Sequence, residues 1–361
     1  FAALRPRALT GAVQLAGVDW SSPLLPAPMQ NLRLDAALTS QSLAVRSLQG
    51  VIGGIPVELQ GSVQGRLLEG EIRQIDLSWT TLGAVQGLMN LIGGQAPPTS
   101  YPLPELAGKF TGQGRLRLRE PLAGAWPDAL DRADLDGRLM FQDGVLRHPW
   151  FPTPLQRLNG QVDFTLREAA FRRLTGDCLG ARFELDGFLR GRPAFWIAPD
   201  AALQARLSGD LSVLIPRLAA GFPSLRPALA PLGQPQGPYE LALALTGDPR
   251  TPATVQYRGS LRLADAQVLL DQPLVNGRLQ VERAELQWTT NTLRLADFSG
   301  ALGGIRLAAQ ADLSPTSGGL RLRAEAPLAE VKARIPILLK RFRVDGQATA
   351  SVQTTLRMLP T

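Results

Sequence analysis

The chain has 361 residues, of which 45% are hydrophobic and 19% charged, and its formal net charge is +7. The basic residues are almost all Arg and alternate with apolar residues, as in 115–119, a pattern typical of a solvated strand face. A nucleic-acid site would add interleaved aromatic side chains or a basic helix, so we expect no nucleic-acid partner. The 36 Gly and 29 Pro disfavour long helices and predict a mainly β protein.

The first distinctive element along the chain is the phrase QGVIGGIPVELQG at 49–61. It returns as TGDCLGARFELDG at 175–187 and as SGALGGIRLAAQA at 299–311. The matched glycines Gly54, Gly180 and Gly304 give a repeat of about 125 residues. Because no linker separates the copies, we expect one continuous body with unit 1 at 1–133, unit 2 at 134–256 and a partial unit 3 at 257–361.

Each phrase ends in alternating apolar residues, which predicts a half-buried strand. Further strands are expected at 137–141, 161–166, 182–189 and 239–245, where apolar and polar residues also alternate. Turns are expected between them at 142–144, 158–160 and 246–249, which contain Gly with Asp or Asn. One short helical crossover is predicted for each unit: at Leu82–Ile92, around Pro216 and around Pro336.

The glycine pairs Gly53-Gly54 and Gly303-Gly304 lack the Gly-Lys-Ser/Thr that a phosphate-binding loop would carry. We interpret them as bends or bulges in a curved sheet. The predicted fold is therefore an elongated, curved antiparallel β-sheet groove, a β-taco. With about seven strands per unit at a spacing of ~4.8 Å, it would extend about 100 Å.

The chain contains few residues of the types that catalysis or metal binding requires. The single histidine, His148, lies in a proline-flanked aromatic segment, and no second histidine is available to complete a metal site with it. Acidic residues such as Asp134 and Asp136 are interpreted as turn residues. Cys178 is expected to be a small buried apolar residue. We therefore expect no enzyme activity, no cofactor and no metal.

A sheet with one apolar face has to bury that face against another layer or curl around it. With one short crossover per unit, curling is favoured, which predicts an apolar trough with an Arg-rich outside. The residues expected to line this trough are Leu139, Phe141, Val162, Phe164, Phe183, Leu185, Leu241, Leu243, Leu245, Leu261, Leu263, Leu279, Val281, Leu293, Leu295, Ile305 and Leu307.

The order of glycines and alternating strands in Gly137–Leu146, Pro154–Leu166 and Leu174–Leu189 resembles the AsmA-like superfamily. This superfamily of repeating β-groove proteins includes TamB-like and YhdP-like members and is related to bridge-like lipid-transfer proteins. The resemblance implies a periplasmic protein that conducts phospholipids between the inner and outer membranes along its groove. It also implies an inner-membrane anchor outside this chain, which opens on Phe1 and is expected to be a piece of a longer protein.

A second hypothesis assigns the same sheet a structural role. Its edge would receive β-segments of an outer-membrane protein client by strand addition, which makes the protein a scaffold for outer-membrane biogenesis. The single cysteine is compatible with either the cytosol or the periplasm, and the lipid class is open.

Overall fold

The computed structural model describes residues 10–21, 27–66, 71–84, 105–119, 133–147, 153–192, 199–230, 232–248, 251–271, 276–328 and 346–357. The chain divides into two compact units. Unit A comprises 1–176, 185–203 and 247–254, and unit B comprises 177–184, 204–246 and 255–361. The three predicted repeats were defined by sequence similarity and not by contacts between residues, so they stay a prediction.

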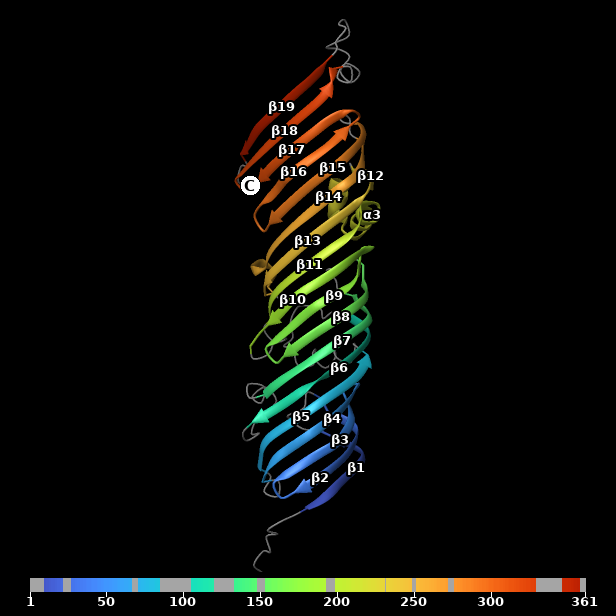
Figure 1. The fold of residues 1–361 in the computed structure, drawn as a ribbon, viewed down its shortest axis with the longest axis vertical. Helices are drawn as coiled ribbons and strands as arrows, with labels where there is room; N and C mark the ends of the chain where they lie inside the picture. The colour runs from blue at the N-terminus through green and yellow to red at the C-terminus, as the bar shows by residue number, and fades with distance from the viewer. Residues whose placement is uncertain are drawn as a thin grey trace, which may run out of the picture. The chain divides into compact units, whose positions relative to one another are not determined.

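The described residues are mainly β, as predicted, and their nineteen strands are assigned to one open antiparallel sheet. In unit A, eight strands pair in chain order (Figure 1). These strands are β1 (Thr10–Trp20), β2 (Met29–Thr39), β3 (Ser42–Ile52), β4 (Ile55–Arg66), β5 (Glu71–Ala84), β6 (Glu105–Arg119), β7 (Ala133–Arg147) and β8 (Leu155–Thr165).

Strands β9 (Glu168–Cys178), β10 (Ala181–Arg190) and β11 (Asp200–Asp210) have residues in both units. In unit B, β12 (Leu232–Gln236) and β13 (Pro238–Gly247) both pair with β14 (Gln256–Asp271). Strand β13 contributes its last residue, Gly247, to unit A. The remaining strands follow β14 in chain order: β15 (Asn276–Thr289), β16 (Leu293–Leu302), β17 (Ile305–Leu313), β18 (Ser317–Pro327) and β19 (Gln347–Arg357).

The thirteen-residue phrase forms the same two-residue hairpin in all three places. The turns are Gly53-Gly54, Leu179-Gly180 and Gly303-Gly304, and both central residues of each turn have positive φ, from 51° to 85°. Positive φ at both positions defines the type I′ turn, whose twist matches that of the flanking strands. The interpretation of these glycines as bends or bulges is therefore wrong, because they close hairpins.

At the opposite ends of these strands, the loops share a hydrogen bond between a threonine side chain and the backbone. The hydroxyl oxygens of Thr39, Thr165 and Thr289 each accept a hydrogen bond from the backbone N–H three residues further on, at 2.9, 3.1 and 3.2 Å. These threonines are 126 and 124 residues apart, the same offsets as the glycines of the phrase. The side-chain oxygen satisfies a backbone donor in the loop, so a threonine is favoured at this position.

Two of the expected turns are wrong. Residues 142–144 lie inside β7 and 158–160 lie inside β8, and the pairing of these strands shifts register there. Asp143 and Arg157 have φ of 48° and 50°, and the N–H of Asp143 donates to Asn159 Oδ1 at 3.2 Å. The glycine, Asp and Asn residues thus serve β-bulges within long strands, which increase local twist. The turn expected at 246–249 stays a prediction, because β13 includes Thr246 and Gly247 and Pro249 lies outside the described residues.

The predicted crossover around Pro216 is helix α3 (Leu211–Gly221), which contains the proline. Asp210 caps it by accepting from the N–H of Ser212 at 2.8 Å. It is followed by the short helical turns η2 (Pro223–Leu225) and α4 (Arg226–Leu229), and η3 (Pro252–Thr254) follows β13. The helix expected at Leu82–Ile92 does not start at Leu82, which lies in β5, and residues 85–92 and Pro336 fall outside the described residues.

The sulfur of Cys178 is buried, as predicted, and burial raises the pKa of its thiol. Burial, followed by the charge of the Cys178 thiolate, raises the pKa of the neighbouring Tyr239 to about 12. Because only the thiolate is nucleophilic, we expect Cys178 to react with a disulfide reagent at pH 7 at least about tenfold more slowly in the folded chain than in urea. Equal rates in the two states would contradict this packing.

Candidate functional site

In unit B, apolar side chains form rows that run across the strands. Directly opposed residues of an antiparallel pair lie on the same face of a sheet. The pairing therefore places one such row on a single face of β13 to β18: Leu241, Leu261, Leu286, Leu295, Ala311 and Leu320. A neighbouring row on the same face consists of Tyr239, Leu263, Ala284, Phe298, Ala309, Leu322 and Val352.

Unit A carries the same arrangement. Its longest row crosses all eight strands from β1 to β8: Leu15, Leu34, Leu48, Leu59, Trp79, Gly114, Gly137 and Phe164. A second row on the same face contains Val57, Thr81, Gly112, Leu139 and Val162. Each unit therefore presents an apolar face whose rows run perpendicular to its strands.

Two glycines in the first row lie beneath aromatic rings. A Cβ on Gly137 would be 2.6 Å from the ring of Trp79 and 2.7 Å from that of Phe164, and the centroids of these two rings are 5.9 Å apart. A Cβ on Gly114 would meet Trp79 at 2.7 Å. The rings fill the space that the missing side chains leave, which protects the glycines within the strands. In unit B, Trp288 covers Gly259 in the same way.

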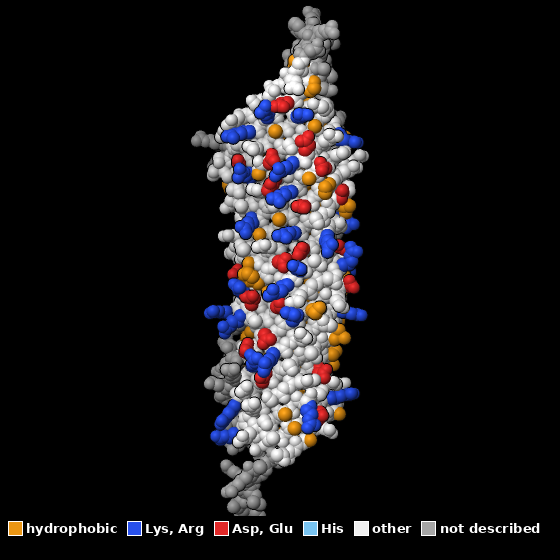
Figure 2. All heavy atoms as spheres, viewed as in Figure 1, with side chains coloured by type: hydrophobic (Ala, Val, Ile, Leu, Met, Phe, Trp, Pro, Cys, Tyr) orange, Lys and Arg blue, Asp and Glu red, His pale blue; other side chains and the backbone are white. Residues whose placement is uncertain are grey.

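The other face of each unit carries ion pairs between neighbouring strands. Arg138 and Arg172 bind Asp163 at 2.7 and 2.6 Å in unit A, and Arg262 lies 3.4 Å from Glu285 in unit B. Figure 2 shows Lys and Arg side chains interspersed with Asp and Glu over the face in view. These exposed pairs contribute little to stability individually, so their main effect is to keep this face solvated.

The pKa of Asp163 reflects this network. Its partial burial acts to raise the pKa, but hydrogen bonds from Arg138 and Gln161 outweigh that effect and the pKa is lowered. The carboxylate therefore stays ionised at neutral pH and holds both arginines.

The predicted trough residues lie on the apolar faces wherever the pairing is given: Leu139, Phe141, Val162 and Phe164 in unit A, and the eleven from Leu241 to Leu307 in unit B. Phe183 lies in unit B and Leu185 in unit A, both on β10. Four of the seventeen are buried, namely Leu139, Val162, Phe183 and Val281, whereas Leu293 is 39% exposed. The other twelve are half-buried.

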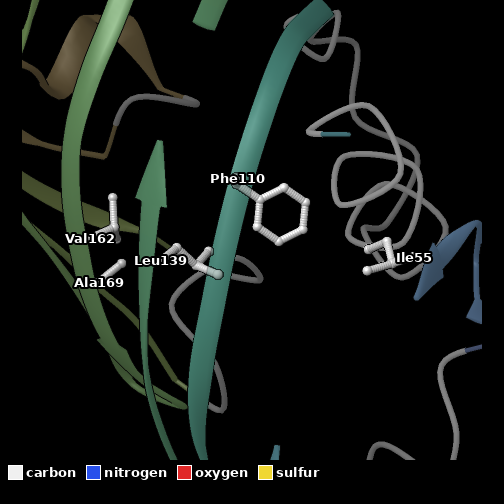
Figure 3. Packing of buried hydrophobic residues seen from close by; sticks show 5 residues of the cluster. All are labelled: Ile55, Phe110, Leu139, Val162 and Ala169. Carbon is white, nitrogen blue, oxygen red and sulfur yellow. The ribbon is translucent and has the colours of Figure 1, made fainter. Parts of the chain in front are cut away.

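The buried members belong to a core. In unit A, Ile55, Phe110, Leu139, Val162 and Ala169 form one cluster, with Phe141 and Phe164 packed against it. Figure 3 shows Leu139, Val162 and Ala169 close together and Phe110 directed toward Ile55. The accessible part of the apolar face therefore consists of the half-buried residues rather than of this cluster.

Several residues of the apolar rows were missed from sequence. In unit B, Leu286, Phe298 and Leu302 share the face of the predicted residues. The register shifts between Val281 and Arg283 and between Leu295 and Phe298 reverse the alternation, so the period of two breaks at these points. The repeat could have found Leu48 and Leu59, because Leu48 directly precedes the first copy of the phrase and Leu59 lies within it at the position that matches Leu185.

His148 lies outside the described residues. Within the described part of the chain, no group of three or more His, Cys, Asp or Glu is placed to hold a metal ion. Among those same residues, no helix is long and apolar enough to span a bilayer.

These features define a mainly β protein with an open antiparallel sheet, which carries an apolar and a charged face in each of its two units. The chain matches no protein-family model, no curated protein and no solved structure.

Proposed function

We propose that the apolar face binds lipid acyl chains and conducts phospholipids, as in the AsmA-like superfamily that the sequence resembles. The observation that carries the proposal is the direction of the apolar rows. In unit B, one row continues from Leu241 on β13 to Leu320 on β18 without a charged residue. An acyl chain lying across the strands would keep apolar contact from strand to strand.

The energetics support a lipid guest. Removing hydrocarbon from water is worth roughly 0.8 kcal/mol per CH₂, so a chain of about 16 carbons gains on the order of 12 kcal/mol as an upper limit. For an acyl chain to move along the face, its free energy of binding has to be nearly the same at each position. A row in which Leu, Ala and aromatic residues follow one another meets that requirement, whereas a single charge would interrupt it.

The proposal extends to the setting that the family resemblance implies. The chain would be a segment of a periplasmic bridge between the inner and outer membranes, built of repeating groove units and anchored by parts outside this sequence. The three recurring hairpins and their capping threonines support a repeated building plan. The charged opposite face would remain in water.

Site-specific photo-crosslinking tests the proposal. A photoreactive amino acid at Leu243, Leu263 or Leu293 on the apolar face should crosslink to phospholipid when the protein is incubated with liposomes. The same probe at Ala264, adjacent to Leu263 and directed to the charged face, serves as the matched control. We expect lipid adducts only from the apolar positions. Adducts at Ala264 in equal yield, or none at any position, would exclude the conduit and favour the scaffold hypothesis.

A further inference from the structure

Each unit has a hollow in its charged face beside a glycine that lies near the start of a predicted repeat unit. In unit A, a hollow of about 690 Å³ lies beside Gly137 and is lined by Asp136, Arg138, Asp163 and Arg172, among others. In unit B, a hollow of about 550 Å³ lies beside Gly259. The two glycines are 122 residues apart and occupy matched places in the sequence repeat. In both hollows the glycine is covered by an aromatic ring, that of Trp79 over Gly137 and that of Trp288 over Gly259.

The hollow of unit B has a distinct shape and chemistry. Its floor carries the small side chains of Ala242, Ala244 and Ser260, which the pairing places side by side on β13 and β14. Around this floor stand three arginines from three different strands, Arg206 on β11, Arg258 on β14 and Arg294 on β16, together with the amides of Gln204 and Gln287 and the hydroxyl of Thr292. Leu243, Gly259 and Trp288 also line the hollow. Long cationic side chains thus surround a floor whose charged-face residues are small.

The two hollows differ in charge, because that of unit A is lined by both basic and acidic residues and that of unit B by basic residues. In unit A the arginines have their counter-charge inside the hollow, because Asp163 binds Arg138 at 2.7 Å and Arg172 at 2.6 Å. Among the described residues that line the hollow of unit B, none is acidic. Arg294 does pair with Asp312 at 3.2 Å, but Asp312 is not part of the lining and is largely exposed.

We propose that the hollow formed by Arg206, Arg258 and Arg294 binds a phosphate group. Guanidinium groups match the geometry of phosphate oxygens and donate paired, charge-assisted hydrogen bonds to them. Three guanidinium groups that share one hollow repel one another, and a dianion placed between them removes that repulsion. The amide of Gln204 supplies a neutral donor beside the arginines. The amide of Gln287 donates one N–H to Glu285 at 2.9 Å and has a second N–H to offer. Most residues that line this site lie on the face opposite the apolar rows, although Leu243, Gly259 and Trp288 of the apolar face also line it.

The phosphate could come from free phosphate or from a phospholipid headgroup at a membrane surface, and the experiment separates these sources. The intact chain is titrated with inorganic phosphate by calorimetry, and separately with vesicles of phosphatidylglycerol or of phosphatidylcholine. The test variant is Arg206→Gln with Arg258→Gln. The control variant is Arg306→Gln with Arg321→Gln, which removes the same charge from exposed positions on β17 and β18.

We expect the test variant to bind at least about tenfold more weakly than the wild type, because it loses two charged hydrogen-bonding groups. The control variant should bind as the wild type does. Loss of phosphate binding identifies a free-phosphate site, and loss confined to phosphatidylglycerol vesicles identifies a headgroup site. Equal weakening in both variants would reduce the effect to net charge and overturn the proposal. Absence of binding to every probe would overturn it as well.

Discussion

Replacing Leu263 by Asp should abolish lipid binding while the chain remains folded. Leu263 is half-buried on the apolar face and lies opposite Tyr239 on β13 and Ala284 on β15. A carboxylate there either draws water onto the row or forces the acyl chain past a charge, at a cost of several kcal/mol. We expect the affinity for a fluorescent phospholipid to fall by more than about tenfold.

The matched control for this substitution is Ala264→Asp. Ala264 is the next residue on β14, is exposed on the charged face and lies opposite Arg283, so a carboxylate there has a cation nearby. It is a better control than Arg262→Asp, because Arg262 pairs with Glu285 and the new carboxylate would face a like charge. Under the scaffold hypothesis, binding depends on backbone groups at a sheet edge, and both variants should then be affected equally. That result would contradict the lipid account.

The second large effect is expected for Gly61→Ala in β4. Gly61 has φ of 146°, and a Cβ at this position would lie 2.1 Å from the backbone carbonyl oxygen of Asp76 on the neighbouring strand. A backbone atom of a paired strand has little freedom to move away, so the strand pair itself would have to separate. Steric overlap and backbone strain together should lower the free energy of unfolding by about 3 kcal/mol or more.

Urea unfolding followed by circular dichroism measures this loss. Gly11→Ala on β1 is the control, because a Cβ there would meet no atom within 4 Å, and we expect a change within about 0.5 kcal/mol. Gly187, which ends the second copy of the phrase, has the same close approach, with a Cβ 2.2 Å from the carbonyl oxygen of Ala202. A Gly61→Ala chain as stable as the wild type would show that the strands are spaced differently there.

The sequence allowed the β class, several strands and the faces of the predicted apolar residues to be inferred, because alternation is a local signal. It did not reveal that the repeated glycines close hairpins. It misassigned 142–144 and 158–160, since Gly with Asp or Asn is equally suited to a turn and to a bulge with positive φ. Only the partner strand decides between them. Charge alternation predicted a solvated Arg face, but not the hollow around Arg258, which depends on residues brought together from several strands.

Burial was the other property that local patterns did not give. Phe183 and Leu185 alternate on β10 as equivalent positions, yet Phe183 is buried and Leu185 is only half-buried. The difference arises from what packs against each side chain, which involves residues distant in sequence. The period of two therefore identifies the residues on the apolar face, and the exposure of each side chain identifies those that can contact a ligand.

Native mass spectrometry of the intact chain, purified from cells in mild detergent, tests most directly whether the apolar face holds lipid. We predict folded charge states displaced upward by the mass of one or more phospholipids, with the displacement lost in Leu263→Asp and retained in Ala264→Asp. Wild-type protein that appears in folded charge states at its bare mass of 38.8 kDa, after incubation with liposomes, would contradict the account.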